Sequence, residues 1–531
     1  MITLSWVHAK LIIFFLNFMS STANRVIKNT GFLYAKMGIT MFISLYTTRL
    51  ILNSLGASDF GIFNIVGGAI AMLGFLNAAM ASATQRFMSY SEGEGNKEKQ
   101  KSIFNVSFVL HLGISFVVGI ALLIAGYFFF NGILNIPDDR IFAAKVVYGS
   151  LIVSTLFTVM TVPYDAAMNA HENMKYYAIV GVFESFLKLG VAFACVYTTF
   201  DKLIVYGSLM ACIPLITLTI MRVYCHRHYE ECVIAPRTYW NKGLMKEMTS
   251  FAGWNLFQTA AAMITNNGVG IVMNMFFGTI INAAQGVANQ ICGQLMTLTN
   301  NLSKAINPII TKTEGKRDHE KVLKFASTSS KATYFITSLF ALPAIITMPL
   351  LLKFWLKNVP DYAVFFAQCQ LIISMCEQLT AGYNVAITAT GKIKGISITK
   401  SIVKFSFLPL SYFLFKLDTS IIIVYCFLVL IQGVFNGLIV PLYYLNKTFD
   451  YTYLRYIKTT FLPCLTSSIF ILLIGYIFKF LLSGWGQLIT VFTICIITNI
   501  LLFLTICLNK EEKSIAIQLK SKMVTIYNLT A

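Results

Sequence analysis

The sequence predicts an all-α integral membrane protein with about fourteen transmembrane helices. The 531 residues are 57% hydrophobic and 12% charged, whereas a soluble chain carries about 25% charged residues. Apolar runs of about 20 residues recur along nearly the whole chain, and each is long enough to cross a hydrocarbon core of roughly 30 Å as a helix. A repeat at an offset of about 222 residues indicates in addition that the protein is duplicated.

The apolar runs are continuous and do not alternate with polar residues, which favours helices over the strands of a membrane β-barrel. Six predicted spans precede the second copy, six lie within it and two follow. In chain order they are residues 30–52, 60–88, 103–130, 142–160, 178–198, 203–223, 250–277, 281–309, 325–355, 362–389, 396–415, 421–445, 460–481 and 488–508.

The repeat holds one register over roughly 80 positions, and its matches fall at a helix start, a turn and a polar loop. Such recurrence predicts one piece of topology used twice. The matched pairs are Gly31-Phe32 with Gly253-Trp254, Gly56 with Gly278, Leu73 with Leu295, Ala83 with Ala305, Glu92-Gly93 with Glu314-Gly315, Lys99 with Lys321, and Ser107 with Ser329.

Six helices per copy bring both copies into the membrane from the same side, so we expect two parallel lobes around a central cleft. Rocking of one lobe against the other would then expose the cleft to each face in turn. The predicted parts are a cytoplasmic N-terminal segment (1–28), an N-lobe (29–223), a cytoplasmic linker (224–249), a C-lobe (250–445), two further helices (446–508) and a cytoplasmic tail (509–531).

The net charge of +19 reflects sidedness and not nucleic-acid binding. About 30 of the 41 Lys and Arg residues fall in alternate loops and in the termini. Because cytoplasmic loops carry the excess of basic residues, both termini are predicted to be cytoplasmic.

Several ionisable residues fall within the predicted helices, where each costs about 2.5 to 3.5 kcal/mol or more and normally faces a cavity or a partner. The basic ones are Lys36, Arg49, Arg86 and Lys304. They indicate a cationic cleft suited to an anionic cargo. The alternative is that their side chains extend to the nearby interface.

Glu184 and Lys188 are four residues apart on one predicted helix, so they can pair. The pair is either a structural salt bridge or an ion-linked switch. Glu377 lies near the middle of another helix without a partner close in sequence, and is either an interhelical hydrogen-bond donor or a coupling site. His111 is expected to pack or to form a hydrogen bond.

Enzyme motifs are lacking: the sequence has no P-loop, no Gly-x-Ser-x-Gly, no His-Glu-x-x-His and no sizeable soluble domain. We therefore expect a protein that is not an enzyme and needs no cofactor. Cys225, His226, His228 and Cys232 suggest a metal site, but their spacing is not that of zinc sites, and a solvated loop is the better interpretation. The short apolar run 11–19 is interpreted as an amphipathic lead-in or an extension from an upstream start, in preference to a signal peptide.

Two blocks resemble a known family. The first comprises Thr48-Arg49-Leu50, Leu55 to Phe63, and Ser82-Ala83-Thr84-Gln85-Arg86-Phe87; the second runs from Pro163-Tyr164 to Ala170 and on through His171-Glu172-Asn173-Met174-Lys175-Tyr176-Tyr177. Both are similar to the Wzx-type polysaccharide (O-antigen) flippases of the multidrug/oligosaccharidyl-lipid/polysaccharide (MOP) exporter superfamily. The likeness covers about residues 24–508.

The resemblance implies a bacterial inner-membrane transporter that moves undecaprenyl-diphosphate-linked oligosaccharide units of lipopolysaccharide, capsule or exopolysaccharide from the cytoplasmic to the periplasmic leaflet. Implied partners are the lipid-linked oligosaccharide, membrane lipids, and a glycan polymerase and glycosyltransferases, with no nucleic acid. Arg49 and Arg86 are the first candidates for the diphosphate, followed by Lys36 and Lys304. Alternatives are a MATE-type multidrug or cation antiporter, which should show buried acids in the first or seventh helix, and a multipass glycan polymerase or ligase.

Overall fold

The computed structural model describes residues 20–71, 74–133, 136–356 and 359–508, and within these ranges every regular element is a helix. The predicted fold class is confirmed. In the described part of the chain, ten helices are long and apolar enough to cross a membrane. Four further predicted spans are not among these ten. Span 30–52 and the start of span 60–88 share one long helix (Ser20–Ala71), and the rest of span 60–88 lies in the next helix (Gly74–Glu94). Span 281–309 continues another long helix, and span 362–389 is broken.

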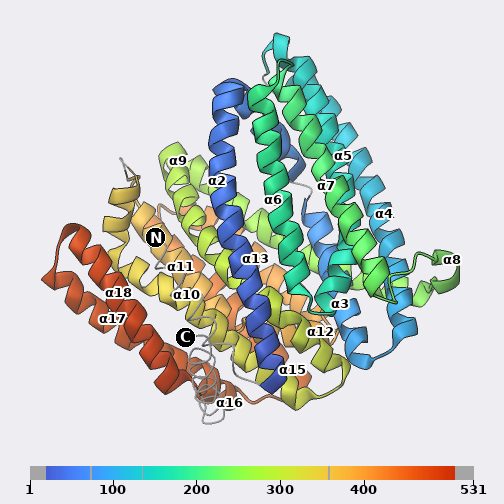
Figure 1. Ribbon diagram of the computed structural model, residues 1–531. Coiled ribbons are helices and arrows are strands. Elements are labelled where there is room, and N and C mark those ends of the chain that lie inside the picture. The colour runs from blue at the N-terminus through green and yellow to red at the C-terminus, as the bar shows by residue number, and fades with distance from the viewer. Residues whose placement is uncertain (1–19, 72–73, 134–135, 357–358, 509–531) are drawn as a thin grey trace, which may run out of the picture. The chain divides into compact units, whose positions relative to one another are not determined.

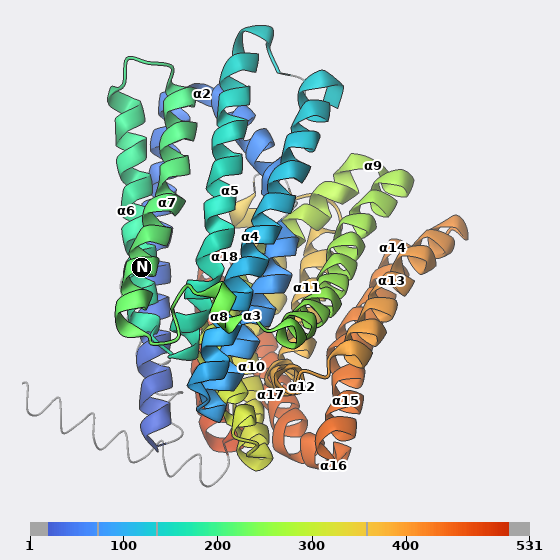
Figure 2. The same ribbon diagram turned by 90° about the vertical axis from the view of Figure 1, so that its right-hand side faces the viewer.

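The described residues divide into two compact units, one of Gly31–Leu256 and one of Phe257–Leu508 together with Ser20–Thr30. The first unit contains α2 (Ser20–Ala71), α3 (Gly74–Glu94), α4 (Lys97–Phe128) with η1 (Phe129–Ile133), η2 (Asp138–Arg140), α5 (Ile141–Ala170), α6 (Met174–Tyr197), α7 (Lys202–His228), α8 (Pro236–Tyr239) and the start of α9 (Lys242–Gly315). Helices α4, α5, α6 and α7 run side by side (Figures 1 and 2).

Two features shape this unit. Gly56 has φ 79° and ψ 168°, which interrupts α2 and separates the two predicted spans, because only glycine adopts such a conformation readily. A buried apolar cluster that includes Val66, Leu122, Val147 and Leu203 packs α2, α4, α5 and α7 together. Helix bounds thus support five of the first six predicted spans, whereas the span 60–88 is shared between the end of α2 and α3.

The second unit contains the rest of α9, α10 (His319–Trp355), α11 (Ala363–Gln378), α12 (Ala381–Ala389), α13 (Lys394–Lys416), α14 (Ile421–Leu428), η3 (Val429–Ile439) and α15 (Val440–Phe449). It ends with α16 (Tyr453–Tyr456), η4 (Ile457–Phe461), α17 (Leu462–Leu481), α18 (Gly484–Leu502) and η5 (Phe503–Cys507). Helices α17 and α18 form an antiparallel pair (Figure 1).

The 222-residue repeat is visible in the turns that precede α4 and α10. Asn96 caps α4 by accepting from the backbone N–H of Lys99, and Asp318 caps α10 by accepting from that of Lys321. The preceding residues, Gly95 and Arg317, both have positive φ, 71° and 58°. Side-chain caps of this kind satisfy orphan N–H groups at a helix start, so the two copies use one device at equivalent positions.

The copies differ in one helix. The first copy has the continuous helix α5, whereas the corresponding stretch of the second is divided into α11 and α12 at Leu379-Thr380. The single predicted span 362–389 is therefore wrong: it consists of two shorter helices. Thr380 stabilises the break, because its hydroxyl donates to the carbonyl of Gly437 in η3.

The predicted loop at 224–249 is partly helical. Helix α7 continues to His228 and α9 starts at Lys242, so Cys225, His226 and His228 lie in the last turn of α7 and not in a solvated loop. Cys225 and Cys232 are buried, and the His226 ring packs edge-on against Phe104 at 6.3 Å. In the described part of the chain, no group of three or more His, Cys, Asp or Glu residues is placed to hold a metal ion.

Glu231 anchors this linker to the first unit. Its side chain is 1% exposed, it is hydrogen-bonded by His171, and Lys97 Nζ lies 3.9 Å from its Oε2. The His171 ring stacks on Tyr229 with centroids 4.2 Å apart. Burial raises the pKa of Glu231, but the hydrogen bond and charge of His171 outweigh it, so the pKa is lowered overall.

We predict that Glu231→Gln destabilises the protein at neutral pH and not in acid. A lowered pKa contributes stability that is present above the ordinary carboxyl value and is lost as the pH falls through the folded value. At pH 7 the variant should unfold roughly 3 °C or more below wild type, since about 1 kcal/mol shifts a midpoint by several degrees. Thermal unfolding measured from pH 7 down to about pH 2, below the lowered pKa, checks this. An equal difference between variant and wild type at both ends of that range contradicts it.

Candidate functional site: a charged pocket in the first unit

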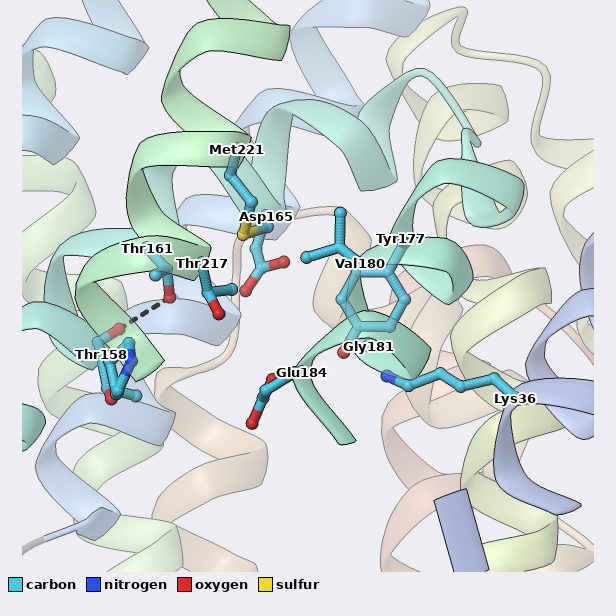
Figure 3. Close-up of a pocket in the computed structure, with 11 residues that line it drawn as sticks. Lys36, Thr158, Thr161, Asp165, Tyr177, Val180, Gly181, Glu184, Thr217 and Met221 are labelled. Atoms are coloured by element: carbon cyan, nitrogen blue, oxygen red, sulfur yellow. Dashed lines mark hydrogen bonds between the residues drawn. The ribbon is translucent and has the colours of Figure 1, made fainter. Parts of the chain in front are cut away.

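A polar pocket of about 200 Å³ lies within the first unit, between α2, α5, α6 and α7 (Figure 3). Two of its sides are acidic and one is basic. It is lined by Lys36 from α2, by Thr158, Thr161 and Asp165 from α5, by Tyr177, Val180, Gly181 and Glu184 from α6, and by Pro214, Thr217 and Met221 from α7.

Helical spacing places these side chains together. Residues three or four apart share a helix face, and Tyr177, Gly181 and Glu184 follow this spacing on α6. Asp165 follows Pro163, which lies inside α5. A proline there removes a backbone N–H donor from the helix ladder and leaves a carbonyl free, which adds polarity near the pocket.

Lys36 reaches into the pocket across α6 (Figure 3). Its ammonium lies 4.2 Å from the centroid of the Tyr177 ring, a cation–π contact typically worth about 0.5 to 2 kcal/mol. The Lys36 side chain passes so near Gly181 that a Cβ there would overlap its Cε. Gly181 therefore provides the space that lets Lys36 turn inward instead of toward the interface.

Glu184 and Lys188 form the predicted ion pair, with Nζ and Oε1 2.7 Å apart and side chains 35% and 42% exposed. The pair links the pocket to the exposed side of α6 and offsets the charge of Glu184. Lys36 and Asp165 are the remaining charged groups of the pocket wall. The site thus combines one ammonium with two carboxylates.

Of the other predicted basic residues, Arg49 and Arg86 do not line this pocket. Arg49 is exposed on α2, 13 residues further along, or about 20 Å at 1.5 Å per residue. Arg86 packs its guanidinium on aromatic rings, 4.5 Å from Phe87 and 4.8 Å from Tyr90. Lys304 is half-buried on the α9 part of the second unit. Their assignment to a diphosphate stays a prediction.

Sequence reasoning missed Asp165 and found Glu377 only as an isolated acid. Asp165 ends an apolar run just after Pro163, inside the second family-like block. This position is the sequence feature that could have marked it as a candidate site residue. Glu377 lines a separate cavity of the second unit, described below. His111 is fully buried, with Nδ1 2.8 Å from the carbonyl of Ser107, so the expected hydrogen bond is confirmed.

The family model described as MatE matches residues 34–194, a range that includes Lys36, Asp165, Tyr177 and Glu184. Among solved structures, a MOP superfamily transporter from Pyrococcus furiosus superposes with a TM-score of 0.68 at 13% identity, covering 83% of this chain and 99% of that one. The chain has the fold of MOP superfamily transporters.

Further likenesses agree. An outward-facing multidrug resistance MATE transporter of the MOP superfamily matches with a TM-score of 0.65 and 13% identity over 84% of this chain and 99% of its own. The membrane protein EpsK of Bacillus subtilis (strain 168), described as uncharacterized, is 22% identical over 320 residues, which are 58% of this chain and 60% of that relative. The match therefore spans less than two thirds of EpsK.

We predict that Gly181→Val destabilises the protein because the added side chain collides with Lys36. Overpacking typically costs about 1 to 3 kcal/mol, so the thermal midpoint should fall by roughly 3 °C or more. The loss should be much smaller in a Lys36→Ala background, since coupled neighbours are not additive. Gly190→Val on the same helix, where a Cβ meets nothing within 4 Å, is the control. Equal losses in both backgrounds would refute the contact.

Proposed function

We propose that this protein is an alternating-access exporter that moves polyprenyl-diphosphate-linked glycans across the membrane. The inward-turned ammonium of Lys36 carries the proposal. A cation on an apolar helix is costly unless it meets a partner or a cavity, and Lys36 faces a cavity on the ring of Tyr177.

An ammonium in a low-dielectric pocket attracts phosphate oxygens more strongly than it would in water. Lys36 is therefore the group that we assign to the cargo's diphosphate, with Arg49 and Arg86 as further basic positions of the first unit. Thr158, Thr161 and Thr217 add hydroxyls that could donate to the same oxygens. The family-like blocks and the shared fold support an exporter, while the glycan cargo rests on the sequence resemblance and on these charges.

Replacing Lys36 tests the proposal. We expect wild-type protein in liposomes to carry undecaprenyl-diphosphate-linked N-acetylglucosamine to the opposite leaflet, measured by access of a glycosyltransferase added outside. Lys36→Met should slow this movement at least about tenfold, because a hydrogen bond to a charged group is worth about 1.5 to 3 kcal/mol. Lys175→Met, at an exposed lysine two residues before Tyr177, should leave the rate unchanged. An unaltered rate in Lys36→Met, or no movement by wild type, refutes the proposal.

Export of organic cations is the second candidate, and the acids of the pocket favour it. Asp165 and Glu184 line the same space as Lys36, so the helices of the first unit do bring carboxylates to a cavity, although none lies in the first or seventh predicted span.

Under this second function, proteoliposomes should expel tetraphenylphosphonium when a pH gradient is imposed. Asp165→Asn should abolish that efflux, because the neutral amide of asparagine cannot pair with a cation or exchange a proton as a carboxylate does. Efflux by wild type without movement of the lipid-linked sugar would replace the first function by the second. Lipid movement without such efflux excludes the second.

A further inference from the structure

A second polar cavity, of about 210 Å³, lies wholly within the second unit, between α9, α11, α13 and the α14–η3 stretch. At about 30 Å³ per liquid water molecule, the cavity has the room of roughly seven waters. Six of the polar side chains in its wall carry the argument: Thr265, Gln285, Ser374, Glu377, Lys404 and Gln432.

The cavity lies where the two copies of the repeat differ. Glu377 is in the last turn of α11, next to the break that the first copy lacks. The facing element is η3, whose π-helical turns contain Gly433 and Gly437. A Cβ on Gly437 would lie 3.4 Å from Glu377 Cγ, so the glycine lets the two elements approach. Discontinuous helices and π-helical turns are both frequent at functional sites.

Three polar atoms of this wall are buried without a hydrogen-bond partner among the described residues: Thr265 Oγ1, Gln285 Oε1 and Gln432 Nε2. Their residues are 2%, 4% and 8% exposed. Buried polar atoms are almost always paired in folded proteins, and each unpaired one costs about 1 to 3 kcal/mol. Three of them around one cavity indicate that the cavity takes a ligand with matching polar groups.

The chemistry of the wall narrows the ligand class. A metal cation would meet the Lys404 ammonium and the amide N–H donors of Gln432, while an anion would meet the Glu377 carboxylate and the carbonyl of Gln285. Lys404 and Glu377 bring opposite charges to the same wall, and amides offer donors and acceptors together. An uncharged ligand whose hydroxyls both donate and accept fits this set.

We infer that the cavity is a sugar-binding subsite, which holds an uncharged, polyhydroxylated ring through Glu377, Gln285 and Gln432. The inference deepens the proposed function and rests on it, because the ring would belong to the glycan of the exported lipid. The Glu377 carboxylate and the Gln285 carbonyl would each accept a hydrogen bond from a sugar hydroxyl, and the Gln432 amide N–H would donate one to a hydroxyl or ring oxygen.

The test compares two lipids that differ only in the sugar: undecaprenyl diphosphate and undecaprenyl-diphosphate-linked N-acetylglucosamine. Binding to the full-length protein in nanodiscs is measured for wild type, Glu377→Gln and Gln285→Ala. Thr155→Val is the matched control, since Thr155 occupies the position of Glu377 in the first copy and its hydroxyl bonds to its own helix at Leu151.

Wild type and Thr155→Val should bind the sugar-bearing lipid at least about tenfold more tightly than the bare diphosphate. Glu377→Gln and Gln285→Ala should each reduce that preference about threefold to tenfold, as expected for the loss of one hydrogen bond, without changing affinity for the bare lipid. Equal affinity of wild type for the two lipids overturns the inference. So does sodium binding that Glu377→Gln abolishes, because it would make the cavity a cation site.

Failure of the proposed function has a different signature. If neither lipid binds, the proposed export of lipid-linked glycans is wrong. The sugar subsite is then tested separately, by measuring the thermal midpoint of the protein with and without free N-acetylglucosamine at about 100 mM. A ligand that binds only the folded state raises the thermal midpoint. A rise in the thermal midpoint of wild type that is absent in Gln285→Ala supports a sugar site that is independent of lipid export. The absence of any rise in wild type overturns the inference.

Discussion

The cost of placing polar groups on apolar helices governs both cavities of this protein. A charge or an amide within such a helix must find a partner, an interface or a cavity. In the first unit Lys36 meets Tyr177, and Glu184 is paired with Lys188. In the second, Glu377 and Lys404 line one space together with amide side chains. Each arrangement lowers the cost of its polar groups by facing them to a shared cavity.

Small residues make these arrangements possible. Gly181 leaves the space through which Lys36 crosses α6, and Gly437 lets η3 approach the end of α11. A Cβ on Gly181 would overlap the Lys36 side chain, whereas a Cβ on Gly437 would make a close contact, 3.3 Å from the backbone nitrogen of Glu377. The two glycines therefore influence the chemistry of each site through packing.

Duplication gave both copies the same capped turn, before α4 and before α10, yet the polar sites of the two units differ. The first unit keeps α5 continuous and places a lysine and two acids in its pocket. The second divides the corresponding stretch and surrounds its cavity mainly with amides, hydroxyls and one pair of opposite charges. An exporter whose cargo has a charged diphosphate and an uncharged glycan can use such a difference. The first unit would bind the diphosphate and the second the glycan.

The sequence by itself determined the all-helical class, the repeat and the local Glu184–Lys188 pair, because hydropathy, a fixed offset and i,i+4 spacing are properties of neighbouring residues. Only the tertiary structure brought Asp165 to Lys36, separated Arg49 and Arg86 from that pocket, and divided the 362–389 stretch beside Glu377. These outcomes depend on contacts between helices far apart in the chain. The hydroxyl of Thr380 bonded to Gly437 and the Lys36 chain across Gly181 are contacts of this kind, for which no local pattern exists.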